Sequence, residues 1–225
     1  MQADAERAKS AAWFFKTGKG EYGEGDQFLG IRVPVQRKIA HRFVHLPLRE
    51  IERLLKSPVH EHRFTAAEIL VARYEHASEP ETETIFEFYL SNARRLNNWD
   101  LVDTSAPYIV GAHLLQRPRD PLFHLAKSSN VWERRIVIVS TFAFLKQGQM
   151  EDTFHISEML LDDTHDLIHK AVGWALRESG KVSRDRLLGF LKEHYGNLPR
   201  TTLRYAIEHL PEKQRKQVLR GQFGF

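Results

Sequence analysis

The stretch HEHRFTAAEIL (60–70) recurs in outline three times later in the chain, and this recurrence decides the fold. The related segments are WERRIVIVSTF (132–142), LIHKAVGWAL (167–176) and TLRYAIEHL (202–210). Each places a basic residue just before a run of small or β-branched apolar residues. The basic residues that align are Arg63, Arg135, Lys170 and Arg204. They are separated by 72, 35 and 34 residues, so one unit of the series is hidden near residue 100.

A period of about 35 residues with two helices per unit is typical of α-helical solenoids. Apolar residues follow a helical period over most of residues 49–210, and alternating strand patterns are nearly absent. We therefore predict an all-α fold, a curved α-helical solenoid of HEAT-like repeats with about six helix pairs. We expect residues 1–225 to form a single domain, in which the Gly-rich segment 16–30 is a flexible connection.

The aligned basic residues allow two interpretations. Solenoids of this kind place one helix of each pair on a concave face, so Arg63, Lys170 and Arg204 would draw a positive, DNA-binding stripe along it. Alternatively, the same residues are solvated helix ends close to the next unit. The sequence favours neither interpretation over the other.

The hidden unit contains NNWDLVDTSA (97–106), which offers an acid where its neighbours offer a base. Trp99 and Asp103 are four residues apart, so both side chains project from the same face of a helix. An acid in a row of bases weakens the binding of DNA, but it stabilises a cation. The pair is therefore a candidate site for a positively charged substrate.

The composition is compatible with a partner that is a polyanion. The formal net charge of the 225 residues is +4, and the pI is about 9.3. The absence of cysteine excludes disulfides, cysteine-based zinc sites and thiol catalysis. We find no signal-peptide pattern and no apolar run long enough for a membrane span, so we expect a cytoplasmic protein that does not bind a membrane.

Two short motifs suggest ligands but lack the context that would support them. GKGEYG (18–23) fits the glycine spacing of a dinucleotide site, yet a helical segment precedes it instead of a strand. His165 and His169 are spaced like zinc ligands, but the adjacent acids are better explained as a turn and helix cap. We therefore expect no nucleotide cofactor and no metal site.

Four stretches together resemble the AlkD family of alkylpurine DNA glycosylases, and the similarity extends from about residue 4 to residue 210. They are WDLVD (99–103), NVWERR (130–135), KAVGWALRE (170–178) and QFLGIRVP (27–34). The resemblance implies a HEAT-like fold and, as substrate, double-stranded DNA that carries alkylated purines. It also implies a monomer associated with the nucleoid.

The resemblance also implies roles for individual residues. Asp103 matches the catalytic acid, and Trp99 and Trp174 match active-site tryptophans. Arg135 matches a further active-site residue, and Arg177 a DNA contact.

Two features depart from the family pattern. Ala143 occupies a position where the family can carry a lysine, and Lys146 is the nearest base, which makes it the candidate DNA contact there. The EYGEGD segment (21–26) is longer than the shortest family members need.

The function expected from the sequence is hydrolysis of the N-glycosidic bond of cationic N3- or N7-alkylated purines by a monofunctional glycosylase. Two alternatives compete with it. One is a noncatalytic repeat protein that binds damaged or branched DNA, and it gains nothing from Asp103. The other is a solenoid that binds proteins. Such a protein gains nothing from the Trp-x-x-Arg spacing that Trp132 and Arg135 share with Trp174 and Arg177.

Overall fold

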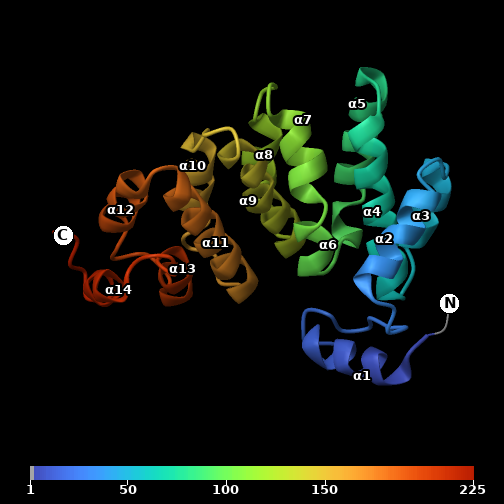
Figure 1. Cartoon of the computed structure of the whole chain (residues 1–225), viewed down its shortest axis with the longest axis horizontal. Coiled ribbons are helices and arrows are strands. Elements are labelled where there is room, and N and C mark those ends of the chain that lie inside the picture. Colours follow the sequence, from blue (N-terminus) through green and yellow to red (C-terminus); the bar gives the residue numbers. More distant parts are fainter. Residues whose placement is uncertain (1–2) are drawn as a thin grey trace. The chain divides into compact units, whose positions relative to one another are not determined.

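The computed structural model describes residues 3–225, and every regular element among them is a helix (Figure 1). The all-α class is therefore confirmed. Outside the helices, an isolated β-bridge joins Gln27 to Val59. The chain divides into two compact units, Met1–His113 and Leu114–Phe225.

The first unit carries the N-terminal helices. They are α1 (Ala5–Phe14), α2 (Val33–Arg42), α3 (Leu48–Leu55), α4 (His60–His76), α5 (Glu79–Ser91), η1 (Ala93–Arg95), α6 (Trp99–Asp103) and the π-helical η2 (Pro107–Gly111). The long helix α4 is central, because it packs against α2 and α3 and also against α5, α6 and η2. A short helix, α7 (Ala112–Leu114), ends this unit and begins the next.

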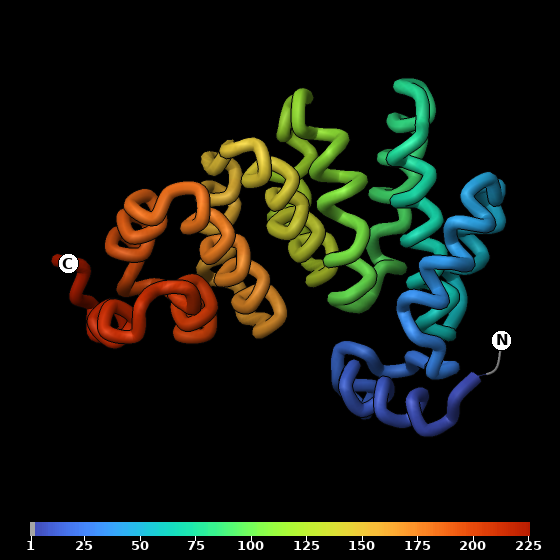
Figure 2. Tube along the Cα trace, in the orientation of Figure 1, coloured from blue at the N-terminus to red at the C-terminus, as the bar shows by residue number. Residues whose placement is uncertain are grey.

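The second unit is a series of paired helices (Figure 2). They are α8 (Asp120–Leu125), α9 (Val131–Leu145), α10 (Glu151–Met159), α11 (Asp166–Val182), α12 (Arg184–Glu193), α13 (Arg200–Ala206) and α14 (Glu212–Val218). Helix α11 packs most extensively on α13 and α9, while α10 and α12 cover other sides of it. The aligned residues Arg135, Lys170 and Arg204 thus lie on helices that stack in succession.

Local sequence signals explain where many of these helices begin. Asn130 caps α9, because its side-chain oxygen accepts the N–H groups of Trp132 and Glu133 at 2.9 and 3.3 Å. Pro34, Pro80 and Pro121 lie in the first turns of α2, α5 and α8, where the missing N–H costs no hydrogen bond. Among the described residues, no helix has both the length and the apolar character that crossing a bilayer requires.

Part of the segment predicted as a flexible connection is anchored to α4. The backbone N–H groups of Leu29, Gly30 and Ile31 donate to the buried carboxylate of Glu61 at distances of 2.8–3.2 Å. Gly30 has a φ of 76°, and a Cβ there would lie 2.1 Å from the carbonyl oxygen of Asp4. Only glycine fits this close approach to the start of α1. Residues 29–31 therefore contact both α4, through Glu61, and the N-terminal end of α1.

The stacking of α11 on α13 depends on Gly173. A Cβ at this position would lie 2.5 Å from Tyr205 Cβ and 2.7 Å from the carbonyl oxygen of Thr202. We expect Gly173→Ala to lower the free energy of unfolding by about 1–3 kcal/mol, because the two helices must move apart. Denaturant unfolding measures this change.

Gly189 in α12 is the matched control. A Cβ at Gly189 meets no atom within 4 Å, so Gly189→Ala should stabilise the protein by up to about 1 kcal/mol through helix propensity alone. Destabilisation by both changes to the same extent would contradict the close approach at Gly173.

Candidate active site and nucleic-acid interface

Helix α6 consists of the Trp-Asp-Leu-Val-Asp segment, which begins after a capping residue and ends where the regular helix is interrupted. Asn98 caps its start, since the side-chain oxygen accepts the N–H of Trp99 at 2.9 Å. Leu101 and Val102 point into the core and are 0% exposed. Trp99 and Asp103, on the remaining face, are half-buried.

Pro107 explains why the helix is interrupted after Asp103. Proline has no N–H to donate to the carbonyl of Asp103 four residues earlier, so regular α-helix cannot continue. The chain passes instead through the wider η2 before resuming helix in α7. Such π-helical insertions are frequent at functional sites.

Trp99 packs on the end of α1. Its ring lies 5.3 Å from the ring of Phe15 and 5.8 Å from that of Phe14, measured between centroids. Phe14 is 56% exposed and Trp13 is 81% exposed. An aromatic surface open to solvent therefore continues from α6 onto α1.

The charge of Asp103 acts on the buried hydroxyl of Tyr89. Tyr89 of α5 is 0% exposed and exchanges a hydrogen bond of 2.7 Å with Ser105. Burial raises the pKa of Tyr89, the hydrogen bond with Ser105 lowers it, and the charge of Asp103 raises it further. The phenol therefore stays neutral, and it supports the turn that follows α6.

A network of buried charges fixes the start of α6. The Nε2 atom of His60 lies 2.8 Å from Asp100 Oδ2, and its Nδ1 atom lies 3.3 Å from Asp26 Oδ2. The imidazole packs against the rings of Phe15 and Phe28, at centroid distances of 4.9 and 4.7 Å, and these two rings also stack on each other at 5.4 Å. His60 thus joins α1, the 26–28 segment, α4 and α6.

These contacts keep His60 charged. Burial alone lowers the pKa of His60, but the hydrogen bonds to Asp100 and Asp26 outweigh this effect and raise the pKa to about 9. An imidazolium that is hydrogen-bonded to two carboxylates and packed against aromatic rings is a stabilising arrangement. Asp100, the first aspartate of the motif, is therefore bound within this network by His60.

Arg63 belongs to the same network, which corrects its predicted place in a surface stripe. The residue is 3% exposed, and its Nη2 atom lies 2.6 Å from Asp26 Oδ1. Its Nη1 atom donates to the carbonyl of Ser57 at 2.8 Å. Arg63 is thus an interior residue that connects α4 to the loops before it.

Arg135 is likewise an interior residue. It is 5% exposed, and its Nη1 atom donates to the carbonyl of Leu167 at 2.7 Å. Leu167 lies in the first turn of α11, the helix that carries Trp174. Because both residues are buried, Arg63 and Arg135 are neither part of a surface stripe nor solvated helix ends. Each instead links neighbouring elements from the interior.

The remaining basic candidates of the second unit lie at the surface or beside it. Lys170 is partly exposed and forms an ion pair of 2.7 Å with Asp166, and Arg204 is exposed. Arg177 forms an ion pair with Glu208 and also lies close to Glu178. Of these three, Arg204 has the most accessible charge.

Trp174 lines a shallow apolar hollow of about 310 Å³. Its indole meets the ring of Phe142 edge to face, with 4.5 Å between centroids. Lys146, Lys181 and Glu178 also line the hollow, and Lys181 pairs with Glu178 at 2.6 Å. The hollow therefore combines an aromatic wall, on which a planar group can stack, with side chains of both charges.

The histidine pair in the second unit caps a helix. His165 Nδ1 accepts the N–H of Leu167 at 3.2 Å, and Asp163 binds Arg134 at 2.5 Å. Burial is the main cause that lowers the pKa of His165. Within residues 3–225, no group of three or more acidic, histidine or cysteine side chains has the arrangement of a metal site. We had predicted an aspartate as the cap, but His165 occupies that position.

Comparison with known proteins identifies the family of the chain. The sequence profile of a family described as DNA alkylation repair enzyme matches residues 1–210. The chain belongs to the DNA alkylation repair family. No curated protein matches the sequence.

A solved structure shares the fold of this family member. It is described as a predicted DNA alkylation repair enzyme from Enterococcus faecalis, and it superposes with a TM-score of 0.73 at 18% sequence identity. The match covers 94% of this chain and 98% of the other. The two chains therefore share a fold over most of their lengths.

Sequence reasoning missed the network around His60. Its members Asp26, His60 and Asp100 are 34 and 40 residues apart in sequence, so no local spacing marks them. The basic helix α2, in contrast, carries a composition signal that the sequence alone displays.

Proposed function

We propose that this family member is a DNA glycosylase that removes cationic N3- and N7-alkylated purines from duplex DNA. The observation that carries the proposal is Asp103, a half-buried carboxylate next to Trp99 on α6, in a basic member of a DNA repair family. We also propose that residues 1–225 act as one functional domain, without a cofactor.

The charge of the substrate explains why a carboxylate suits this reaction. An N3- or N7-alkylated purine is already positive, so it leaves as a neutral base without protonation. As the bond between the base nitrogen and C1′ breaks, positive charge moves onto the deoxyribose. A nearby carboxylate stabilises that charge, and water then adds to C1′ while its proton passes to Asp103 or solvent. Unmodified purines lack the charge and keep their bond.

The remaining residues have proposed roles that follow from their positions. Trp99 offers an indole face to the cationic nucleotide, with about 0.5–2 kcal/mol for the contact. Trp174 is proposed as an aromatic contact of the second unit to the DNA. Arg177, Lys170, Arg204 and Lys146 are proposed to bind phosphates, which positions the protein without reading sequence. Arg135 is retained as a supporting residue, because it holds the start of the helix that carries Trp174 and Arg177.

Release of 7-methylguanine from methylated duplex DNA tests the proposal. The purified protein should liberate the free base under single-turnover conditions and leave an abasic site with an intact strand. Strand cleavage would indicate a lyase step, which a monofunctional enzyme lacks. DNA binding without any release would leave a noncatalytic repair protein instead.

Arg204→Ala should weaken the binding of every duplex sequence alike. Each phosphate contact that is lost should make the salt dependence of the affinity shallower by about one unit. Fluorescence anisotropy with undamaged duplexes at several salt concentrations measures both effects. Arg186 is the control, because Glu151 already pairs with its guanidinium at 2.7 Å. A loss that depends on the sequence would point to base contacts and contradict the phosphate role.

A further inference from the structure

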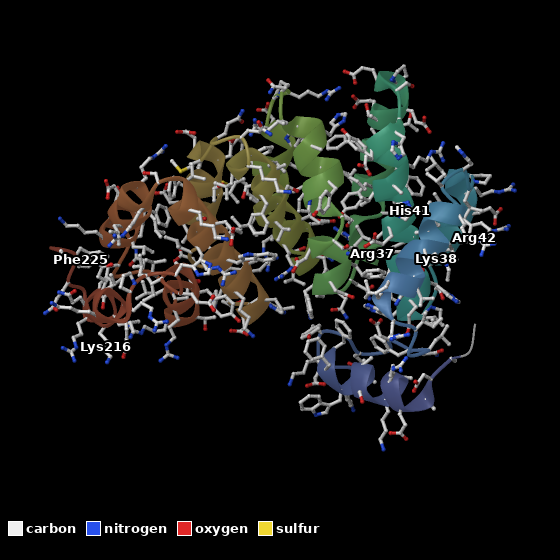
Figure 3. The ribbon with its side chains drawn as sticks, in the orientation of Figure 1. Arg37, Lys38, His41, Arg42, Lys216 and Phe225 are labelled. Carbon is white, nitrogen blue, oxygen red and sulfur yellow. The ribbon has the colours of Figure 1, made fainter. Side chains whose placement is uncertain are left out.

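Helix α2 presents a basic face that the proposed function has not used. Its ten residues, VPVQRKIAHR, contain no acid. Four exposed side chains lie on it in two adjacent pairs, and Figure 3 labels them. They are Arg37, Lys38, His41 and Arg42.

The spacing of these residues makes one surface. Lys38 and Arg42 are four residues apart, as are Arg37 and His41, so each pair projects from the same side of the helix. Gln36 and Ala40 are the buried residues of α2, and they lie on its other side, where the helix packs on α4. The charges therefore face away from the core.

The neighbouring helix shows that this accumulation of charge is specific to α2. On α3, Arg49 and Arg53 both pair with Glu50, at 3.2 and 2.9 Å, and Lys56 pairs with Glu52 at 2.5 Å. Among the described residues, no acid forms an ion pair with Lys38 or Arg42. The basic face of α2 therefore keeps its charge available for an external anion.

Polar contacts connect this face to the turn beside Asp103. Arg37 Nε lies 3.0 Å from Glu68 Oε1 on α4, and the hydroxyl of Thr104 donates to the same oxygen at 2.6 Å. Arg37 Nη2 also donates to Thr104 Oγ1 at 3.3 Å. Thr104 follows Asp103 directly, so the basic face and the candidate catalytic carboxylate lie on neighbouring parts of one surface of the first unit.

We infer that the basic face of α2, through Lys38 and Arg42 with His41 between them, binds the phosphate backbone of duplex DNA beside the candidate active site. The inference rests on the proposed function for its ligand. Arg37 already forms an ion pair with Glu68 and a hydrogen bond with Thr104. It therefore connects α2 to the turn after α6 and contributes less to phosphate binding. Compact ammonium and guanidinium groups without an apolar pocket contact phosphates and do not read bases.

The test compares two double variants of the first unit, each of which removes two positive charges. Lys38→Ala with Arg42→Ala should weaken the binding of an undamaged fluorescent duplex roughly tenfold at 0.1 M salt and make the salt slope shallower by about two units. Arg49→Ala with Arg53→Ala, on α3, should change the affinity less than about twofold, since both arginines are held by Glu50, which offsets one of the two charges. Single-turnover excision should stay unchanged in the α3 variant, which serves as the control for folding and chemistry.

The outcomes separate this inference from the proposed function. Unchanged affinity of the α2 variant, or equal losses from both variants, would overturn it, and so would a loss confined to particular sequences. Failure of the unaltered protein to bind any duplex would also overturn it. If the unaltered protein binds duplex but releases no 7-methylguanine, the glycosylase proposal fails while the α2 comparison still decides the backbone contact.

Discussion

Asp103→Asn should reduce the single-turnover excision of 7-methylguanine by about 10²–10³-fold. The amide keeps the shape of the side chain and loses its charge. At an effective dielectric constant of ~20, opposite charges 4 Å apart interact by roughly 4 kcal/mol, and each 1.4 kcal/mol corresponds to about tenfold in rate. Duplex affinity should hold or rise, because a negative charge has left a surface that faces phosphates.

The control for this variant must be an acid outside the charge network. Asp100 is unsuitable, although it precedes Asp103 on the same helix, because it binds His60 at 2.8 Å. Asp162 lies on an exposed turn of the second unit, and Asp162→Asn should leave excision unchanged. Equal losses from the two variants, or none from Asp103→Asn, would remove Asp103 from the mechanism.

The stability of the first unit should fall between about pH 6.5 and pH 9 because of His60. The pKa of His60 is raised from 6.5 to about 9 in the folded protein. The folded state therefore holds the proton more tightly than the unfolded state. Its stabilisation is fully present below about pH 6.5, and it is lost as the pH rises through about 9. A difference of this size corresponds to about 3 kcal/mol.

Denaturant unfolding at a series of pH values measures this loss. His60→Gln should be less stable than the unaltered protein at pH 6 and should lose little further stability up to pH 9.5. Asp100→Asn removes the partner at 2.8 Å, so it should lower the pKa of His60 and shift the loss to lower pH. The same pH dependence in all three proteins would show that His60 does not carry the effect.

Local patterns in the sequence were sufficient for the class of fold and for the helical nature of its repeated segments. The stretch 60–70 lies within the long helix α4, which spans His60–His76. Arg135, Lys170 and Arg204 were aligned by their spacing, and they lie on α9, α11 and α13, which stack in turn. These features follow from the sequence because helix formation and repeat length depend on residues close together in the chain.

Only the tertiary structure decided which of the aligned side chains reach solvent. Arg63 and Lys170 precede similar apolar runs, yet Arg63 is buried against Asp26, whereas Lys170 is partly exposed. The same holds for the aspartates of α6, since Asp100 is bound by a histidine 40 residues earlier. Burial and ion pairing depend on which distant segments pack together, and the desolvation of a charge is repaid only where a partner lies within hydrogen-bond distance. That partner is supplied by the packing of α1, the 26–28 segment and α4 around α6, which no local pattern encodes.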